Sequence, residues 1–308
     1  MSTPKKQHLI PRCYLKQFVD PRTPEGQEPY VWIFERDKRR GRKKAPKNIL
    51  AETDFYTLKG GDYTIEKTLA QIESEYSAIF DRKICKKKPL SPEEHVLFCA
   101  FIAAMLQRTL KQKENIERFI DQIVEKVTQL EKAQGIPPNT SDEWKKNKEH
   151  AHKLSVLAML PEITKILSQM NIAFLCSAGR ASFITSDAPA YLFNSALQFQ
   201  RLYGPGLKQK HVEVHMPLSP KISVCFSWLN NMRGYVTIGE DLVHESNRMI
   251  FGHSHQSFIA NSPKIRRRWF RRFPLDPIFM WRWLKHEILT RYQRLRARRY
   301  YDGRRRSR

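Results

Sequence analysis

The sequence predicts an α+β fold: a helical N-terminal half packed with a mixed or antiparallel sheet that is built mainly from the C-terminal half, plus a basic C-terminal helix. In residues 65–79 and 116–130 the apolar residues recur at three- and four-residue intervals, which is the spacing of one helix face. Beyond residue 172 short apolar runs are separated by Gly, Pro and Asn, which is typical of short strands joined by turns. A chain of 308 residues without internal repeats is long enough to bury one large core or two smaller ones.

Four helices are expected in the first half. A short one opens at Pro11, which suits the first helical position because an N–H there would have no partner. Helical spacing predicts the second over residues 65–83. Ser91, followed by a proline and two glutamates, is a helix-start signal, and we expect that helix to continue to about residue 134. The fourth is expected over residues 141–170.

One strand is expected early in the chain and the others late. Residues 30–36 are aromatic and β-branched, as strands are, and should return to pair with the later strands. Residues 37–47 are expected to form a solvated basic loop, and residues 51–58 a helical turn or a short strand. The later strands are expected at residues 172–175, 181–184, 211–215, 222–228, 235–238 and 257–260, interrupted by a helix over residues 239–251.

The cysteines and the apolar runs exclude several classes of protein. Five scattered cysteines, with no C-x-x-C pair, indicate reduced thiols in a cytoplasmic protein and argue against a disulfide framework or a zinc–thiolate site. The opening M-S-T-P-K-K lacks the apolar core of a signal peptide. No run of about 18 apolar residues occurs, so we expect no transmembrane segment.

The positive charge is concentrated at the C-terminal end. The chain carries a net charge of +24, and residues 264–308 contribute +14 of it, from 17 Lys or Arg and 3 Asp or Glu. We therefore expect one α+β domain over residues 1–263 and a basic, aromatic-rich helix or tail over residues 264–308. Arginine binds phosphate bidentately and aromatic rings stack on unpaired bases, so RNA or DNA is the expected partner of this tail. The arginines expected to contact it are Arg266, Arg267, Arg268, Arg271, Arg272, Arg294, Arg298 and Arg299.

Two other roles for the tail stay open. A basic helix with tryptophan on one side can lie on an anionic membrane surface. Alternatively, the tail helix docks onto the body of the protein through its apolar residues, which are Ile278, Met280, Trp281, Leu284 and Ile288.

Polar residues at unusual places suggest a shared site. Two glutamates lie seven residues apart on one expected helix and so share a face. A Gln-Arg pair ends a buried apolar stretch, and a Ser-Asp pair follows an expected strand, where functional side chains are common. The alternative is structural: solvated or paired carboxylates, a capping turn, and an arginine that neutralises a glutamate. The candidate site residues are His8, Glu66, Glu73, Gln107, Arg108, Ser186, Asp187 and Asn247.

A second pattern involves histidines. His211, Glu213 and His215 alternate along one expected strand face, and His253 and His255 do the same. If the two segments were neighbouring strands, they could hold zinc or manganese. Hydrogen-bonded or surface histidines are the alternative.

Several motifs occur in an order that is similar to one known family. They are H-L-I-P-R-C-Y-L-K-Q-F, V-W-I-F-E-R, E-T-D-F-Y, I-E-K-T-L-A-Q-I-E, F-I-A-A-M-L-Q-R-T, F-I-T-S-D-A-P, P-L-S-P and a helix that carries Asn247. Over residues 7–260 the chain resembles the bacterial proteins grouped as domain of unknown function family 4238. The resemblance implies a fold and a set of site residues, and no reaction.

Twelve positions match the family's pattern and one departs from it. The departure is Ala188, where such proteins usually have asparagine, and it weakens a catalytic role for the turn that contains it. The matching residues are His8, Pro11, Glu66, Glu73, Gln107, Arg108, Ser186, Asp187, Pro189, Pro217, Pro220 and Asn247.

Three functions remain open from the sequence. The first is a nuclease (a phosphodiester hydrolase) in a defence or toxin setting, with Mg²⁺ or Mn²⁺ held by Glu66, Glu73 and Asp187. In it, His8 would act as general acid or base and Arg108 would stabilise the developing charge. The second is a non-catalytic nucleic-acid-binding protein, in which the polar set ties the helices to the sheet. The third is a membrane-surface or partner-binding module that uses the tail helix.

Overall fold

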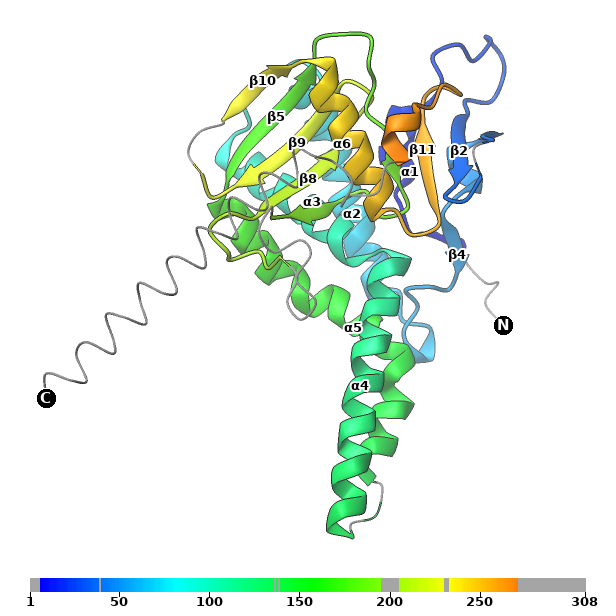
Figure 1. Ribbon diagram of the computed structural model, residues 1–308, viewed down its shortest axis with the longest axis vertical. Coiled ribbons are helices and arrows are strands. Elements are labelled where there is room, and N and C mark those ends of the chain that lie inside the picture. The colour runs from blue at the N-terminus through cyan, green and yellow to red at the C-terminus, as the bar shows by residue number, and fades with distance from the viewer. Residues whose placement is uncertain are drawn as a thin grey trace, which may run out of the picture.

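A computed structural model describes residues 6–38, 40–135, 137, 139–194, 205–229 and 233–270. It confirms the α+β class, with helices concentrated in the first half and sheets built mainly from the second (Figure 1). The expected basic C-terminal helix lies outside the described residues, as do Arg271, Arg272, Arg294, Arg298 and Arg299. None of the described helices is long and apolar enough to cross a membrane.

The helices of the first half follow the predicted periodicity. The opening helix α1 continues as a 3-10 turn, and a single π-helical turn extends α2. Their bounds are α1 Arg12–Leu15, the 3-10 turn Lys16–Phe18, α2 Thr64–Ile79, the π turn Phe80–Ile84, α3 Pro92–Gln107, α4 Leu110–Gln134 and α5 Asn139–Gln169. Ser91 forms the expected capping box with Glu94 at the start of α3.

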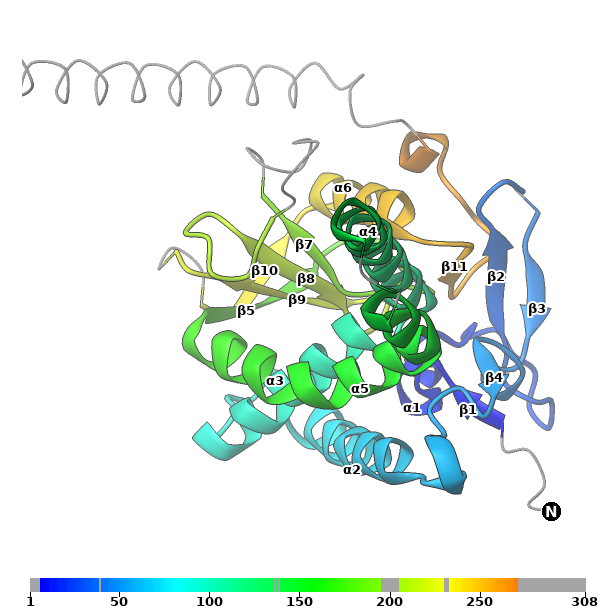
Figure 2. The ribbon, with the colours of Figure 1, turned by 90° about the horizontal axis from the view of Figure 1, so that it is seen from below.

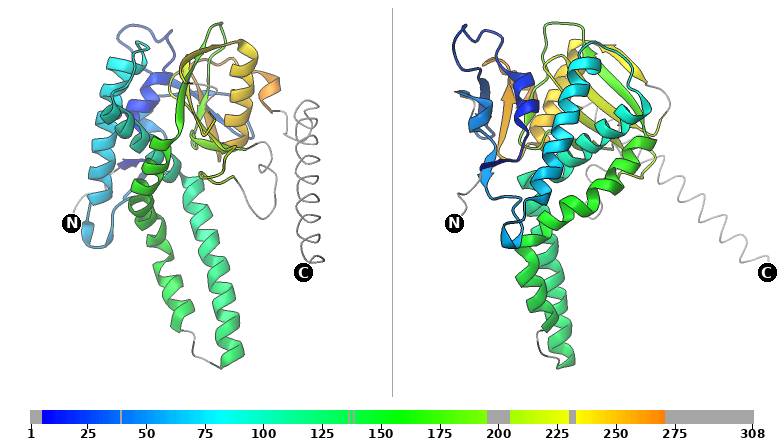
Figure 3. Two further views of the ribbon diagram at one scale, coloured as in Figure 1. Left: turned by 90° about the vertical axis from the view of Figure 1, so that its left-hand side faces the viewer. Right: turned by 180° about the vertical axis from the view of Figure 1, so that it is seen from behind.

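The expected single helix over residues 91–134 is in fact two helices, α3 and α4. Arg108 leaves helical geometry at φ −87° and ψ 11°. Thr109 is extended, and its hydroxyl accepts a hydrogen bond from the Gln112 N–H, which caps the new helix. The break lets the chain change direction, and α4 and α5 then form a two-helix arm that projects from the body (Figures 1 and 3).

The larger sheet has five strands in the order β10-β5-β9-β8-β7. β10 and β5 are parallel and the other neighbours are antiparallel, so of the two predicted arrangements, mixed or antiparallel, this sheet has the mixed one. The helices α3 and α5 cover one face of it, and the helix α6 lies on the opposite side (Figure 2). The bounds are β5 Asn171–Ser177, β7 Tyr191–Phe193, β8 Glu213–Pro217, β9 Ile222–Ser227, β10 Gly234–Ile238 and α6 Glu240–His253.

The smaller sheet has four strands in the order β3-β2-β11-β6, all antiparallel. It confirms that the N-terminal strand β2 returns to pair with β11 near the end of the domain. A separate pair, β1 with β4, ties the start of the chain to the segment before α2. The bounds are β1 Lys6–His8, β2 Val31–Glu35, β3 Arg42–Lys44, β4 Ala51–Thr53, β6 Thr185–Ser186 and β11 Ser257–Ala260.

Two strand predictions are wrong in detail. The basic segment 37–47 is not only a loop, because its residues 42–44 pair with β2 as the edge strand β3. Residues 181–184 are not a strand, and the pairing with β11 instead involves Thr185 and Ser186. The apolar run before these residues packs into the interior without joining a ladder, since Phe183 and Ile184 are buried.

Aromatic rings from three helices form the centre of the core. Tyr76 of α2 stacks on Phe101 of α3, with 3.6 Å between ring centroids. Tyr14 of α1 packs against Phe101 at 6.4 Å. All three side chains are buried, so the opening helix is fixed to the helices that carry Glu73 and Arg108.

Candidate functional site

Arg108 links three segments of the chain at the break between α3 and α4. Its Nη1 donates to Glu73 Oε1 over 2.6 Å, and its Nη2 donates to the main-chain oxygen of His8, also over 2.6 Å. Its side chain is 3% exposed, whereas that of Glu73 is 26% exposed. The structure thus brings Arg108, Glu73 and the main chain of His8 together.

Gln7 holds the other predicted glutamate. Its Nε2 donates to Glu66 Oε2 at 3.1 Å and to Thr57 Oγ1 at 3.0 Å. Its Oε1 accepts from the Tyr56 N–H at 2.5 Å, and the Tyr56 hydroxyl donates to the Arg108 oxygen at 2.8 Å. Gln7 is 2% exposed, so its amide belongs to the interior. Gln7 and Tyr56 were not among the predicted site residues, although Gln7 directly precedes the opening motif and Tyr56 ends the E-T-D-F-Y motif.

The side chain of His8 and the main-chain oxygen of Gln107 have partners outside the Arg108–Glu73 contact. The His8 ring lies with its Nε2 3.3 Å from the Lys47 oxygen. Burial lowers the pKa of His8, although the hydrogen bond with Lys47 opposes this shift. The Gln107 oxygen accepts from His152 Nε2 at 2.9 Å, which holds α5 against the end of α3. The described contact of the His8 ring therefore joins β1 to the segment around Lys47, and that of the Gln107 oxygen joins α3 to α5.

The predicted residues of the second half form a separate group of contacts. The Asp187 carboxylate accepts hydrogen bonds from three successive N–H groups, those of residues 255–257, at 2.8, 2.6 and 2.8 Å. Ser186 Oγ accepts from the Ala188 N–H at 3.1 Å. Asn247, which is fully buried, accepts from the Ile184 N–H and donates to the oxygen of residue 182. These side chains fix β11 and α6 to the segment between β5 and β7.

The predicted metal ligands Glu66, Glu73 and Asp187 are not assembled into one site. Within the described part of the chain, their oxygens do not gather within 4.8 Å of one another. The reason lies in their partners: Glu66 is held by Gln7, Glu73 by Arg108 and Asp187 by main-chain N–H groups. The metal assignment made from the sequence is corrected accordingly.

The histidine pattern is correct for one segment and wrong for the other. Glu213 and His215 do lie on one face of β8, but His211 precedes the strand. His253 is the last residue of α6, and His255 pairs with Glu114 at 2.9 Å. These two histidines therefore do not form a strand beside β8.

Tyr14 joins three of the sequence motifs in the interior. Its hydroxyl donates to the Pro217 oxygen at 2.6 Å and lies 2.6 Å from Thr185 Oγ1. Tyr14 comes from the opening motif, Thr185 from F-I-T-S-D-A-P and Pro217 from P-L-S-P. Its ring and hydroxyl are buried, so the three motifs meet in a packed and hydrogen-bonded contact.

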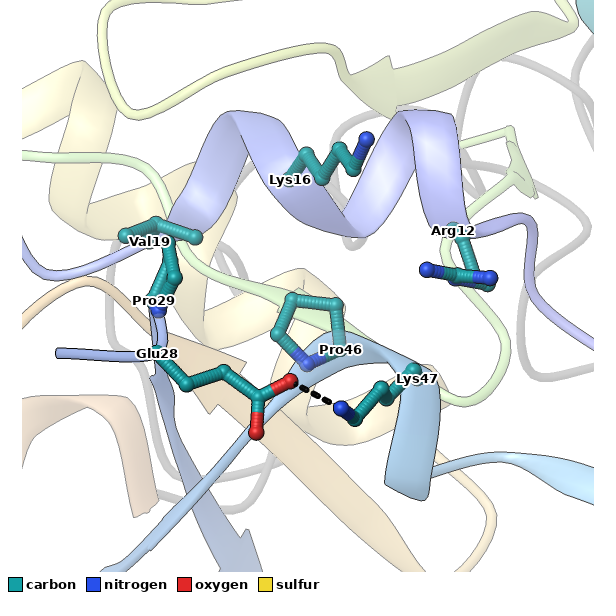
Figure 4. A pocket seen from close by; sticks show the side chains of 7 residues that line it. All are labelled: Arg12, Lys16, Val19, Glu28, Pro29, Pro46 and Lys47. Atoms are coloured by element: carbon teal, nitrogen blue, oxygen red, sulfur yellow. Dashed lines mark ion pairs between the residues drawn. The ribbon is translucent and has the colours of Figure 1, made fainter. Parts of the chain in front are cut away.

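A basic surface lies at the side of the body that carries α1 and the smaller sheet. Arg42, Lys43 and Lys44 of β3 are exposed on the sheet edge. Next to it is a pocket of about 500 Å³, shown in Figure 4, where Lys47 pairs with Glu28 across 2.5 Å. Arg12 and Lys16 line the same pocket from the opening helix and its 3-10 extension, so three cations and one carboxylate surround it.

The sequence pattern of one known family matches residues 6–264 of the 308-residue chain, and that family is described as "Protein of unknown function (DUF4238)". The chain belongs to this family. The match confirms the resemblance seen in the ordered motifs. Neither a curated protein nor a solved structure matched the chain.

The first residues beyond the family match pack on the body of this family member. Trp269 is buried, and its Nε1 donates to His244 Nδ1 of α6 at 3.1 Å. Phe270 packs edge-on against Phe251 of the same helix, with centroids 4.8 Å apart. Arg268 pairs with Asp241 at 3.0 Å. These contacts extend the folded body beyond residue 263, and they use two of the aromatic rings that the sequence had suggested for base stacking.

Proposed function

We propose that this protein binds single-stranded RNA or DNA, and that the surface formed by β2, β3 and the basic pocket contributes to the binding. One observation carries the proposal. Lys43 Nζ lies 4.5 Å from the centroid of the Tyr30 ring and 5.5 Å from that of Trp32. Both rings are half-buried, so each keeps an accessible part beside the exposed cations of β3.

This combination suits the chemistry of an unpaired strand. Lysine side chains neutralise phosphates along the backbone, and aromatic rings stack on bases of any sequence. The Trp32 ring is held in place because its Nε1 donates to Asp20 Oδ2 at 2.7 Å. A fixed ring loses little conformational freedom on binding, which favours affinity.

The pocket beside α1 suits a phosphate group. Arg12, Lys16 and Lys47 outnumber the single carboxylate of Glu28 there. Of these cations, Lys47 already pairs with Glu28, so Arg12 and Lys16 would supply the charge for an anionic ligand. Phosphate contacts of this kind fix the position of a strand without reading its sequence.

The same cations also have a purely structural explanation. Lysines on an edge strand prevent the sheet from pairing with another chain. An anionic membrane surface would attract them as well. The metal-dependent nuclease suggested by the sequence would need a metal ion near Glu66, Glu73 and Asp187, and these three carboxylates are engaged with protein groups. We therefore propose binding without cleavage.

The test compares two variants of the full chain that remove equal charge. One carries Lys16→Gln, Lys43→Gln and Lys44→Gln, which replace three exposed lysines of the pocket and of β3. The control carries Lys126→Gln, Lys145→Gln and Lys146→Gln, which are exposed residues of the α4–α5 arm. Affinity for labelled single-stranded RNA and DNA is measured by fluorescence anisotropy across a salt series.

We expect the surface variant to bind more weakly and to flatten the slope of log affinity against log salt by about 2, as the loss of three phosphate contacts implies. The control should keep the slope of the natural protein. Equal slopes for the two variants would leave the edge-strand explanation. Binding to anionic vesicles but not to oligonucleotides would favour the membrane, and shortened oligonucleotides in the presence of Mg²⁺ would favour a nuclease.

A further inference from the structure

Two adjacent strands of the larger sheet bring three metal-binding side chains together. Glu213 and His215 lie two residues apart on β8 and so share a face. Cys225 of β9 is the register partner of His215 in the β8–β9 ladder. The carboxylate oxygen of Glu213, the imidazole nitrogen of His215 and the sulfur of Cys225 lie within 4.8 Å of one another.

The two contacts to His215 converge on the same atom. Glu213 Oε2 lies 2.8 Å from His215 Nε2, and Cys225 Sγ lies 3.7 Å from that nitrogen. A Cys-His-Glu catalytic triad requires the carboxylate on the opposite ring nitrogen, where it would orient the base. This arrangement is therefore unsuited to a triad. Three donor atoms that surround one point are suited to a shared ion.

The surroundings fix the group and leave one side open. The Tyr191 ring of β7 stacks on the His215 ring at 5.4 Å and 14° between planes, which holds the imidazole in one orientation. Cys225 is 1% exposed. The side chains of His215 and Glu213 are 15% and 29% exposed, so solvent reaches the group from the Glu213 end.

We propose that Glu213, His215 and Cys225 form a binding site for a divalent transition-metal ion of the zinc type. Thiolate, imidazole and carboxylate are all zinc ligands, and a thiolate excludes Mg²⁺ and Ca²⁺ as the preferred ions. Binding releases the thiol proton of Cys225 to solvent as the metal–sulfur bond forms. Three protein ligands leave a fourth position, which water occupies from the open side.

This site is distinct from the basic surface and does not depend on the proposed binding of nucleic acid. It belongs to the larger sheet, whereas the basic surface belongs to β3 and the segment around α1. The cysteine spacing gave no indication of it, because His215 and Cys225 meet through strand register and not through a short sequence motif.

The test uses the full chain, purified without metal and titrated with Co²⁺ as a spectroscopic probe for Zn²⁺. We expect about one equivalent to bind and a sulfur-to-cobalt charge-transfer band in the near ultraviolet, since the ligand set includes a thiolate. Zn²⁺ should abolish the band by displacement. The Cys225→Ser variant should lack the band, whereas the control Cys176→Ser, which alters another buried cysteine of the same sheet, should keep it.

Glu213→Gln provides a variant that is expected to fold, because its side chain is partly exposed. It should keep the charge-transfer band and weaken Co²⁺ binding by at least tenfold, as the loss of one ligand implies. The proposal is overturned if the natural protein shows no charge-transfer band with stoichiometric Co²⁺, or if the Cys176→Ser variant loses the band and Cys225→Ser does not.

Discussion

Arg108 and Glu73 form a 2.6 Å ion pair in which the guanidinium is almost wholly removed from solvent. The arginine lies where α3 ends, and the glutamate lies on the helix that packs beside it. Burial lowers the pKa of Arg108, but Tyr56 and Glu73 more than offset this effect and the net shift is upward. Arg108 therefore keeps its positive charge in the interior at every physiological pH.

Removal of the carboxylate should leave that buried charge without its partner. We predict that Glu73→Gln lowers the free energy of unfolding by about 3 kcal/mol, the lower end for a broken buried pair because Glu73 is partly exposed. Urea unfolding measures it. Glu75→Gln on the same helix is the control and should change stability by less than about 0.5 kcal/mol.

The double variant Glu73→Gln/Arg108→Met tests whether the two charged groups stabilise the fold as a pair. Replacement of both charged groups removes the unpaired charge, so the double variant should be more stable than Glu73→Gln alone. If the free energy of unfolding lost in the double variant equals the sum of the losses in Glu73→Gln and Arg108→Met, the pair contributes no coupling energy.

The Tyr14 hydroxyl should stabilise the contact between the three motifs. Tyr14→Phe would leave the Thr185 hydroxyl and the Pro217 oxygen without this partner, and we predict a loss of about 1–3 kcal/mol. Tyr76→Phe is a matched control, because the Tyr76 hydroxyl is buried with no hydrogen-bond partner among the described residues. That substitution should be neutral or stabilising. Equal losses in the two variants would show that ring packing, and not the hydrogen bonds, decides the result.

Asp187 should act as a structural clamp on the start of β11. An amide side chain can accept at one oxygen only, so Asp187→Asn loses part of a set of charge-assisted hydrogen bonds from residues 255–257. We predict a loss of about 2–4 kcal/mol in the free energy of unfolding, measured with urea. An unchanged stability would contradict this role and return Asp187 to the set of functional candidates.

Much of the fold was predictable because its signals are local. The apolar spacing of α2 and the capping box at Ser91 specify those elements within one or two turns. The break at Thr109 was missed because the apolar pattern continues on both sides of it and a single hydroxyl makes the cap. The strand β3 was missed because Arg-Lys-Lys has no strand-like composition and pairs only because β2 offers a free edge.

The sequence indicated several residues of the candidate site one by one, but it did not indicate which of them lie next to each other. Glu73 with Arg108, and Asp187 in its turn, adopt the structural roles that the sequence analysis left open as alternatives. The proximity of Glu213 to Cys225 depends on the register of β8 and β9, which no local pattern encodes. The sequence therefore did not reveal which residues, far apart along the chain, contact each other in the fold.

His152 should make stability depend on pH. Burial, with Lys113 and Lys153 nearby, lowers its pKa below the ordinary 6.5, and the hydrogen bond with Gln107 only partly opposes this. Below pH 6.5 the unfolded chain binds a proton that the folded protein resists, so stability falls as the pH drops. We predict that His152→Gln shows a smaller fall in Tm between about pH 7.5 and pH 5.5 than the natural protein. The exposed His211→Gln should not reduce that fall, and an equal reduction in both would contradict the prediction.

Two truncations should separate the structural start of the tail from its charge. Truncation after Phe270 keeps the Trp269–His244 contact and removes residues 271–308, which carry 13 Lys or Arg and 3 Asp or Glu. We expect it to unfold cooperatively at an unchanged urea midpoint, yet to bind single-stranded RNA and DNA with a flatter salt dependence than the full chain.

Truncation after Pro263 also removes Trp269 and Phe270 from the aromatic cluster around α6. Since loss of a buried tryptophan costs about 3–5 kcal/mol, its urea midpoint should fall clearly. Equal midpoints for the two truncations would mean that the packing of residues 264–270 contributes no stability. If truncation after Phe270 keeps the salt slope of the full chain, the tail's arginines do not contact phosphates, and any nucleic-acid binding must come from the body.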